Sequence, residues 1–436
     1  MSQHTTPSSV YSIVLIAISM AAIVSLFLVP SSAKSSPPSS LSSSAEAKAL
    51  LHSDWWGNFS STNHCDLAGI VCNGVGSVIR MEPSLFYCNR RLENMNWSSL
   101  PNLEYIDLSG SGLTGGIPNE IGTLSKLTHL NLSLNYGLNE AKLFLQSNQL
   151  DGFIPHDIGR LKNLVELNLS HNNLSGSIPK SIGNLTALTQ LSLSSNRLTA
   201  CIPLEISNLT SLVEMHLRAN ILQGPIPREI GKLKNLVELS SSHNNLHGPI
   251  PPSIGNLIGL TLLDLHSNKL DGSIPPSIGH LSSLAYLYFS SNELNGPIPS
   301  EIGQLKSLIM GLMDHNKLQG PIPQAIGNLA CLTVLDLNNN LLAGHIPLSI
   351  GVLKNLEFLN LSTNFLNGHI PRQLGRLCNL EYLYFAGNEL KGTIPEELAY
   401  LPKLKYLDLS HNNLFGKIPD CLCLVSNFSL SNNPQL

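Results

Sequence analysis

Ile-Pro dipeptides recur along this chain at a fixed interval of 24 residues. Around each one the same frame returns, L-x-x-L-x-L-x-x-N-x-L-x-G-x-I-P-x-x-I-G-x-L, as in "LVELNLSHNNLSGSIPKSIGNL". One repeat is too small to bury its own leucines, so neighbouring repeats must stack into a solenoid with a continuous core. The prolines in strict register are Pro155, Pro179, Pro203, Pro227, Pro251, Pro275, Pro299, Pro323, Pro347, Pro371, Pro395 and Pro419.

Each repeat is predicted to form one short strand and a return arm. The L-x-L segment alternates with period two, as a strand with one buried face does, and the Gly, Pro and Asn that follow turn the chain. The side-chain amide of the frame asparagine can donate and accept, so we expect it to satisfy turn backbone that stacking removes from water. This column includes Asn172, Asn196, Asn220, Asn244 and Asn268.

The repeat also explains a G-x-G-x-x-G match, "GSGLTG" from Gly110 to Gly115, which follows an expected strand. A dinucleotide-binding motif would open a helix within a βαβ unit. Here Gly115 is the frame glycine, Gly110 and Gly112 are variable positions, and no helix pattern follows. The match is interpreted as a by-product of the repeat.

The period breaks once, because Pro118 and Pro155 are 37 residues apart. We interpret this interval as two repeats less 11 residues, with strands ending at Asn135 and Asn148 and one return arm lost. A loop-out or a kink is therefore expected near residues 136–141, together with the fastest internal amide exchange at 133–142. Smaller faults are Ser241 and Gly311, which stand where the frame has leucine.

The first 33 residues resemble a secretion signal. An apolar run from Ile13 to Val29 precedes Ser31 and Ala33, which fit the small-residue rule for cleavage, and a Ser/Pro-rich linker follows at 34–44. A retained membrane anchor is the alternative. A net charge of −4 gives no basic excess for nucleic-acid binding. N-x-S/T sequons, the acceptors for N-glycosylation, occur at Asn58, Asn96, Asn131, Asn168, Asn173, Asn184, Asn208, Asn360 and Asn427.

The LxGxIPxxIGxL motif resembles the plant-specific class of leucine-rich repeats, in particular the ectodomains of plant receptor-like kinases similar to the male-discoverer-interacting group. The resemblance implies an α/β fold, a right-handed solenoid of about 14 strands with its parallel sheet on the concave face. It also implies an N-terminal cap at 45–99, an array at 100–419 with an irregular repeat at 124–155, and an incomplete cap at 420–436. Cys65 and Cys72 match the paired cysteines of the family cap, which implies a disulfide, although Leu67 replaces the family's tryptophan.

The resemblance implies an extracellular protein that binds a secreted peptide or protein ligand, with a co-receptor ectodomain as a further partner and no cofactor. No segment matches the motifs that phosphoryl transfer requires, so kinase activity is not expected. A secreted inhibitor of a microbial wall-degrading enzyme and a truncated gene fragment are the alternatives.

Ligand contacts are expected from variable positions beside the strand leucines, which project from the concave sheet. Tyrosine supplies a rigid apolar surface with one polar group, which suits recognition. Peptide-sensing relatives hold a ligand carboxylate with an R-x-R pair, and "HLR" at 216–218 keeps only the second arginine. The candidate residues are Glu214, His216, Arg218, Tyr286, Tyr288, Phe358, Tyr382, Tyr384 and Tyr406.

Two other groups of residues are considered as a catalytic triad and as a metal site, and both are weak candidates. Ser242, Asp264 and His266 fall close enough for a hydrolase triad, but without a nucleophile elbow. A histidine column formed by His171, His243, His315 and His411 has members at least three repeats apart, too far for one metal ion. No catalytic residue and no metal site are therefore predicted. Cys88, Cys201, Cys331 and Cys378 are expected to be small buried hydrophobes rather than bridges, and the pairing of Cys421 and Cys423 is left open.

Overall fold

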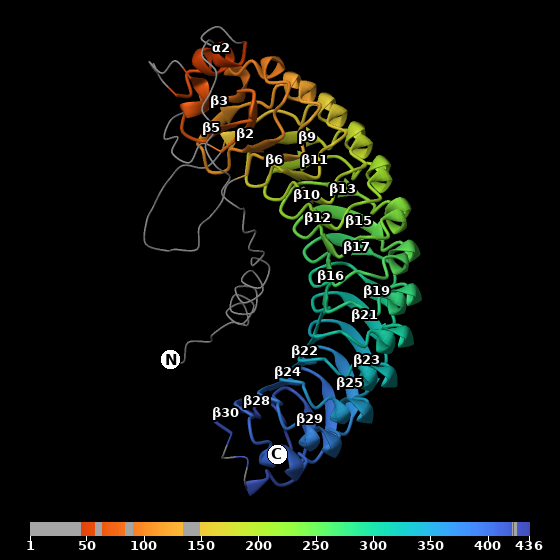
Figure 1. Cartoon of the computed structure of the whole chain (residues 1–436). Coiled ribbons are helices and arrows are strands. Elements are labelled where there is room, and N and C mark those ends of the chain that lie inside the picture. Colours follow the sequence, from red (N-terminus) through yellow and green to blue (C-terminus); the bar gives the residue numbers. More distant parts are fainter. Residues whose placement is uncertain (1–44, 57–62, 83–89, 134–148, 421, 423–424) are drawn as a thin grey trace. The chain divides into compact units, whose positions relative to one another are not determined.

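The computed structural model describes residues 45–56, 63–82, 90–133, 149–420, 422 and 425–436. Within them, a long sheet lines the inner side of a curved array of repeats (Figure 1). Its 16 strands follow chain order: β1 (Ile70–Cys72), β2 (Val78–Met81), β4 (Tyr105–Asp107), β6 (His129–Asn131), β8 (Glu166–Asn168), β10 (Gln190–Ser192), β12 (Glu214–His216), β14 (Glu238–Ser240), β16 (Leu262–Asp264), β18 (Tyr286–Tyr288), β20 (Met310–Leu312), β22 (Val334–Asp336), β24 (Phe358–Asn360), β26 (Tyr382–Tyr384), β28 (Tyr406–Asp408) and β30 (Asn427–Ser429).

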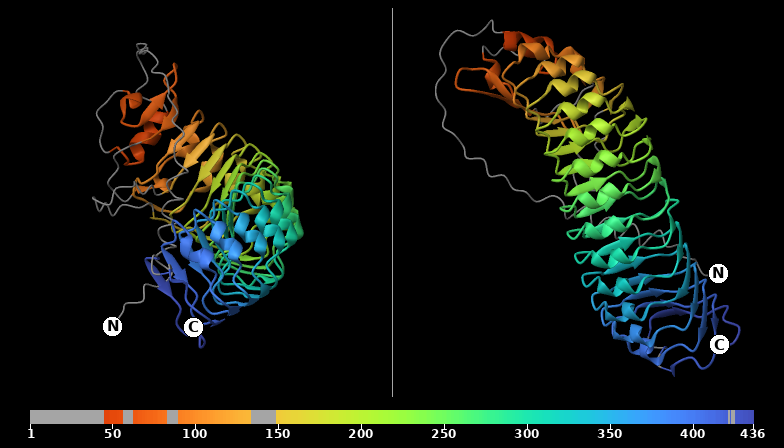
Figure 2. Two further views of the ribbon diagram at one scale, coloured as in Figure 1. Left: turned by 90° about the horizontal axis from the view of Figure 1, so that it is seen from below. Right: turned by 90° about the vertical axis from the view of Figure 1, so that its right-hand side faces the viewer.

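The return arms form short 3₁₀ helices on the opposite side, aligned in a row (Figure 2). In the repeats each begins directly after the frame proline, whose fixed φ suits the residue before a helix. They are η4 (Asn119–Thr123), η5 (His156–Arg160), η6 (Lys180–Asn184), η7 (Leu204–Asn208), η8 (Arg228–Lys232), η9 (Pro252–Asn256), η10 (Pro276–His280), η11 (Ser300–Gln304), η12 (Gln324–Asn328), η13 (Leu348–Val352), η14 (Arg372–Arg376) and η15 (Glu396–Tyr400).

Between strand and helix, each repeat adds a short strand to smaller parallel sheets along one flank. The predicted strand and return arm are thus confirmed, and the flanking strands are an addition. These strands are β3 (Arg90–Arg91), β5 (Leu113–Gly115), β7 (Gln149–Leu150), β9 (Ser175–Ser177), β11 (Arg197–Thr199), β13 (Gln223–Gly224), β15 (Asn245–Pro249), β17 (Lys269–Asp271), β19 (Asn295–Gly296), β21 (Lys317–Gly320), β23 (Leu341–His345), β25 (Phe365–Gly368), β27 (Glu389–Gly392) and β29 (Asn413–Leu414).

The frame asparagines form the predicted ladder inside the turns. Asn268 accepts a hydrogen bond at Oδ1 from Leu246 N (3.0 Å), and its Nδ2 donates to the carbonyls of Ser241 (3.0 Å) and Leu265 (3.1 Å). The residue before it, Ser267, has φ 53°, a left-handed conformation that lets the chain turn out of the strand. One buried amide therefore satisfies backbone groups of two adjacent repeats.

The prediction for the irregular interval is wrong. β6 pairs directly with β8, His129 with Glu166, so no separate strand ending at Asn148 lies between them in the sheet. Asn172 closes the ladder across the interval, since it accepts from Leu150 N (3.1 Å) and donates to Leu132 O (2.9 Å). The interval is thus one repeat with 13 additional residues (37 − 24) after its strand. The expected kink at 136–141 and most of the expected soft segment at 133–142 lie outside the described residues.

The strand number also differs from the estimate of about 14. The N-terminal cap contributes β1 and β2, which pair antiparallel, while β2 pairs parallel with β4, so that 15 of the 16 strands, β2 to β30, run parallel. At the other end β30 pairs with β28, and Asn433 continues the asparagine ladder by accepting from Leu414 N at 3.0 Å. The final residues therefore add another layer of repeat structure.

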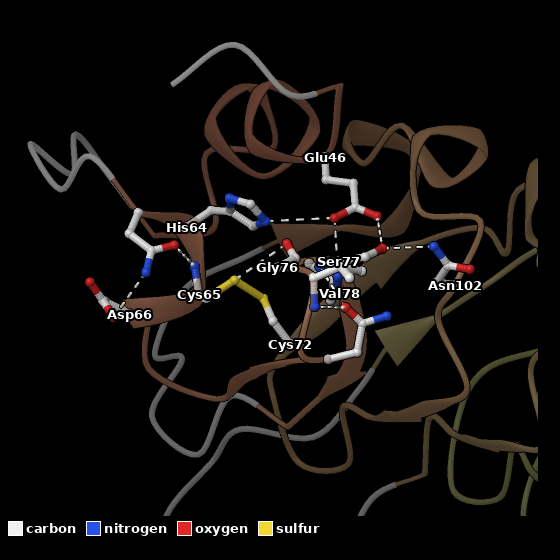
Figure 3. Close-up of a disulfide and its surroundings, with 12 residues drawn as sticks. Glu46, His64, Cys65, Asp66, Cys72, Gly76, Ser77, Val78 and Asn102 are labelled. Atoms are coloured by element: carbon white, nitrogen blue, oxygen red, sulfur yellow. Dashed lines mark hydrogen bonds and ion pairs between the residues drawn. A yellow bond between two sulfur atoms is a disulfide. The ribbon is translucent and has the colours of Figure 1, made fainter. Parts of the chain in front are cut away.

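The N-terminal cap is held by the expected disulfide and by a partly buried carboxylate. Cys65 and Cys72 are bonded, with their Cα atoms 5.7 Å apart. Helix α2 (Ala45–His52) supplies Glu46, which accepts hydrogen bonds from Ser77 Oγ and from Val78 N at 3.0 Å (Figure 3). Three further 3₁₀ turns complete the cap: η1 (His64–Asp66), η2 (Leu92–Asn94) and η3 (Trp97–Ser99).

The two leucine faults have different surroundings. Ser241 is 2% exposed, and its carbonyl accepts from the amides of Asn244 and Asn268. A Cβ placed on Gly311 would lie 3.6 Å from side chains of both Leu308 and Leu335, which is ordinary contact distance. The Gly311 site is therefore underfilled rather than crowded. Among the described residues, no helix is both long and apolar enough to span a bilayer.

Candidate concave binding face

In most repeats the first and third residues of the strand flank a buried leucine and face the inner side of the array. Because the strands pair in register, the same position in successive repeats forms a column across the sheet. Glu238 pairs with Leu262, Leu262 with Tyr286, and Tyr286 with Met310. A column is thus a row of side chains about 4.8 Å apart.

In the later repeats the first column is apolar without interruption. Its members are Leu262, Tyr286, Met310, Val334, Phe358, Tyr382 and Tyr406. The aromatic rings contact one another: Phe358 lies 6.2 Å from Tyr382 and 5.6 Å from Tyr384, and Tyr384 lies 4.9 Å from Tyr406 between ring centroids. Apart from Met310, these side chains are partly exposed. The sequence prediction named the aromatic residues and missed the aliphatic ones between them.

Tyr288 lies on the concave strand β18, as the sequence predicted, but its side chain is covered. It is only 5% exposed, and its hydroxyl lies 3.6 Å from Met310 Sδ. Burial raises the pKa of the Tyr288 hydroxyl above its ordinary value. The residue at this third position is covered by its neighbours, so Tyr288 supports the surface while Tyr286 forms it.

In the earlier repeats the same column is acidic. Glu166, Gln190, Glu214 and Glu238 follow one another across β8 to β14. Burial raises the pKa of the Glu166 and Glu238 carboxyls, whereas a hydrogen bond from His216 lowers the pKa of Glu214. The first column therefore changes from negative to apolar between β14 and β16.

His216 and Arg218, which stand where peptide-sensing relatives have an R-x-R pair, have different surroundings. His216 Nε2 lies between two carboxylates, 3.7 Å from Glu214 Oε2 and 3.6 Å from Glu238 Oε2, while Arg218 is exposed. The surroundings of His216 are thus acidic, and this part of the face suits a cationic group better than a carboxylate.

Ser242, Asp264 and His266, weighed from the sequence as a hydrolase triad and not predicted to be catalytic, lie close together but not in a triad geometry. Ser242 Oγ donates to Asp264 Oδ2 at 2.7 Å rather than to a histidine, and Ser242 is fully buried. His266 Nδ1 contacts Asp264 Oδ1 at 2.5 Å, but its Nε2 lies 2.9 Å from His243 Nε2. Ser242 is thus paired with the carboxylate and not with the imidazole, an order of contacts that differs from a Ser-His-Asp triad.

The cysteine expectation is wrong for the three residues that lie in described repeats. Cys201, Cys331 and Cys378 are exposed free thiols rather than buried hydrophobes, because they occupy the return arms and not the leucine columns. Cys88, Cys421 and Cys423 lie outside the described side chains. In the described part of the chain, His64, Cys65 and Cys72 form a cluster of metal-ligand types, but its two sulfurs are bonded to each other.

The sequons fall into two structural groups. Asn96, Asn184, Asn208 and Asn427 are exposed. Asn131, Asn168, Asn173 and Asn360 are partly buried, and the first, second and fourth lie on the concave sheet. Asn58 and the predicted signal segment lie outside the described residues.

Models of the leucine-rich-repeat family match much of the chain. One described as "Leucine rich repeat" matches residues 141–198 and 354–414. A second with the same description matches residues 102–124, 235–257, 259–281, 283–305 and 331–353. No curated protein sequence matches the chain.

Solved structures with similar coordinates include several plant receptors. A TDR receptor is 34% identical, with TM-score 0.69 over 76% of this chain and 56% of the receptor chain. The plant peptide hormone receptor RGFR1, in complex with RGF2, is 30% identical, with TM-score 0.53 over 84% of this chain and 72% of its own. The Arabidopsis receptor kinase HAESA, in complex with the peptide hormone IDA and the co-receptor SERK1, is 31% identical, with TM-score 0.54 over 77% and 66%.

This chain thus spans only about half of the TDR receptor chain. The repeats, the fold and the similarity to plant receptor ectodomains nevertheless agree with one another. The chain belongs to the leucine-rich-repeat family.

Proposed function

We propose that this protein is a non-catalytic, extracellular, receptor-like protein that binds a secreted peptide or protein along its concave face. The observation that carries the proposal is the division of the first concave column into an acidic part, Glu166 to Glu238, and an apolar part, Leu262 to Tyr406. Similar receptors crystallised with peptide hormones support it.

The length of the apolar part sets the size of the ligand segment. It crosses seven strands, β16 to β28, and six intervals of about 4.8 Å give about 29 Å. An extended peptide advances about 3.3 Å per residue, so about nine residues would cover it. A ligand that continues over β14 to β8 would meet Glu238, Glu214 and Glu166. We therefore propose an extended peptide with an apolar segment and a basic segment.

Binding energy should reside mainly in the aromatic side chains, since a few rigid, well-packed residues usually carry most of the energy of an interface. Tyr286, Tyr382 and Tyr406 are partly exposed members of the column. Their replacement with alanine leaves the buried leucines in place. We expect the triple variant to fold normally and to bind its ligand more than tenfold more weakly, a loss of about 1.4 kcal/mol or more.

The experiment begins with a library of synthetic nine- to fifteen-residue peptides of varied charge, selected on the secreted protein. Enrichment of peptides with basic residues beside an apolar segment is the expected result. The matched control is Tyr400→Ala, which removes an equally large ring that is 67% exposed on η15. Selection without charge preference, or equal binding by the triple variant and wild type, would contradict the proposal.

The finer assignments are also proposals. They are a relationship to the male-discoverer-interacting receptors, a co-receptor as second partner, a cleaved signal at 1–33, and a location at the outer face of the plasma membrane. N-glycans are proposed first for the exposed acceptors Asn96, Asn184, Asn208 and Asn427. The boundaries of the linker, the two caps and the array are proposed as stated from the sequence.

A further inference from the structure

We propose that His243 and His266 form a binding site for a divalent transition-metal ion, with Zn²⁺ as the ion to test. The two side chains come from adjacent repeats, and their Nε2 atoms lie 2.9 Å apart at the edge of the concave face. The ring planes are inclined at 81°, with centroids 4.5 Å apart. Neutral imidazole is a common zinc ligand, and here two ring nitrogens converge on one point.

Asp264 fixes the orientation of His266. Its Oδ1 lies 2.5 Å from His266 Nδ1, which places the proton of the neutral ring on Nδ1 and leaves the Nε2 lone pair directed at His243. Metal-binding histidines in proteins typically donate their second ring nitrogen to a carboxylate in this way. Asp264 is thus a positioning residue for the proposed site.

The carboxylate itself is well anchored. Asp264 is 7% exposed, and its Oδ2 accepts from Ser240 Oγ at 2.8 Å and from Ser242 Oγ at 2.7 Å. Of the three side chains weighed as a triad in the sequence, Ser242 and Asp264 therefore support the imidazole of the third, His266. This support is built before any ion binds.

The distance between the nitrogens needs only a small change. Zinc binds imidazole nitrogen at about 2.0–2.1 Å in tetrahedral geometry, which corresponds to about 3.4 Å between two ligand nitrogens. His243 is exposed and can move outward by the required ~0.5 Å, while His266 stays on Asp264. Two coordination positions would remain for water or for a group of a binding partner.

Other histidines at the position of His243 have different neighbours. His315 Nδ1 pairs with Asp314 Oδ2 at 2.8 Å, and His411 contacts the Asn432 amide. The members of the histidine column therefore do not share one metal site with one another, as their spacing in the sequence led us to expect. The proposed site instead joins one column member to a histidine of the next repeat.

The test uses the secreted full chain without a histidine tag, kept oxidised so that Cys65 and Cys72 offer no thiolate. Zn²⁺ affinity is measured by competition with a chromophoric zinc indicator. The key variant is His243→Ser and its matched control is His171→Ser. Both positions have a left-handed backbone, φ 51° and 53°, and serine occupies the same position at Ser195 and Ser267. Both variants should therefore fold alike.

We expect one zinc ion per chain, at least tenfold weaker binding by His243→Ser, and unchanged binding by His171→Ser. Asp264→Asn should weaken binding by about 10–100-fold with both ligands still present, as loss of a supporting carboxylate does. A second measurement is histidine acylation followed by mass spectrometry, in which Zn²⁺ should protect His243 and His266 selectively. Equal affinity of wild type and His243→Ser, or no protection of these two rings, would overturn the proposal. Neither result bears on whether the concave face binds a peptide.

Discussion

Removal of residues 134–146 should leave the repeat array intact. The deletion joins Ser133 to Ser147 and restores the frame in "LTHLNLSSNQLDGFIP", with Asn148 in the ladder column. Ser147 then takes the left-handed position before the asparagine, where Ser195 and Ser267 have φ 54° and 53°. The hydrogen bonds of Asn172 to Leu132 O and Leu150 N span the interval already, so both ends are in place for a regular turn.

The magnitude follows from the length of the connection between Leu132 and Leu150. It shortens from 18 residues to the 5 that separate Leu169 from Leu174 in the next repeat. Loop-closure entropy changes by about 1.5 RT times the logarithm of that ratio, which gives about 1 kcal/mol in favour of the deletion variant. Amide exchange in β6 and β8, compared with wild type, measures this difference locally.

A deletion of one more residue, 134–147, is the matched control. It shortens the turn so that Asn148 falls on the left-handed position and Leu150, which is fully buried, cannot reach its site. Loss of such a side chain from a core costs about 2–5 kcal/mol. If both deletions destabilise the array equally, or if the 13-residue deletion is the worse of the two, the single-repeat interpretation is refuted.

Three further outcomes can be measured on the same protein. Gly311→Ala should raise the free energy of unfolding by about 1–2 kcal/mol in urea titrations. The added methyl group would lie at ordinary van der Waals distance from its neighbours, and alanine lowers the conformational entropy of the unfolded chain. A destabilised variant would show that there is no room for the methyl group. Burial, followed by the Asp314 carboxylate, raises the pKa of Asp336 to about 7, whereas an unfolded aspartate titrates near about 4. Between pH of about 4 and about 7 the native state binds one more proton at Asp336 than the unfolded state does, so the free energy of unfolding falls as pH rises through this range. The variant Asp314→Asn should make the urea midpoint less dependent on pH. An unchanged pH dependence would contradict the contribution of the Asp314 carboxylate. Reduction of Cys65–Cys72 should increase amide exchange in the cap but not beyond residue 160, since it opens a short loop worth about 2.5 kcal/mol; loss of protection throughout the array would disprove a local role.

The sequence by itself determined the architecture, because a strict 24-residue period leaves few ways to bury the leucines. The solenoid and the role of the frame asparagines were predictable from frame positions, and the parallel inner sheet and the cap disulfide from the resemblance to plant leucine-rich repeats. The irregular interval was not, since its sequence contains two L-x-L-x-x-N patterns and local rules alone do not say how many of them enter the sheet. Only the pairing of β6 with β8 decided between a lost arm and an insertion.

The candidate site divides in the same way. The sequence identified Tyr286, Tyr382 and Tyr406 as surface residues because their frame position faces inward in every repeat. It could not show that Tyr288 is covered, since exposure at the third position depends on which side chains the neighbouring repeats supply. Nor could it bring His243 and His266 together, because two rotatable imidazoles on adjacent turns meet only when packing fixes both rings. The repeat period therefore fixes the backbone position from which each side chain projects. The packing of neighbouring repeats decides which residues that side chain contacts.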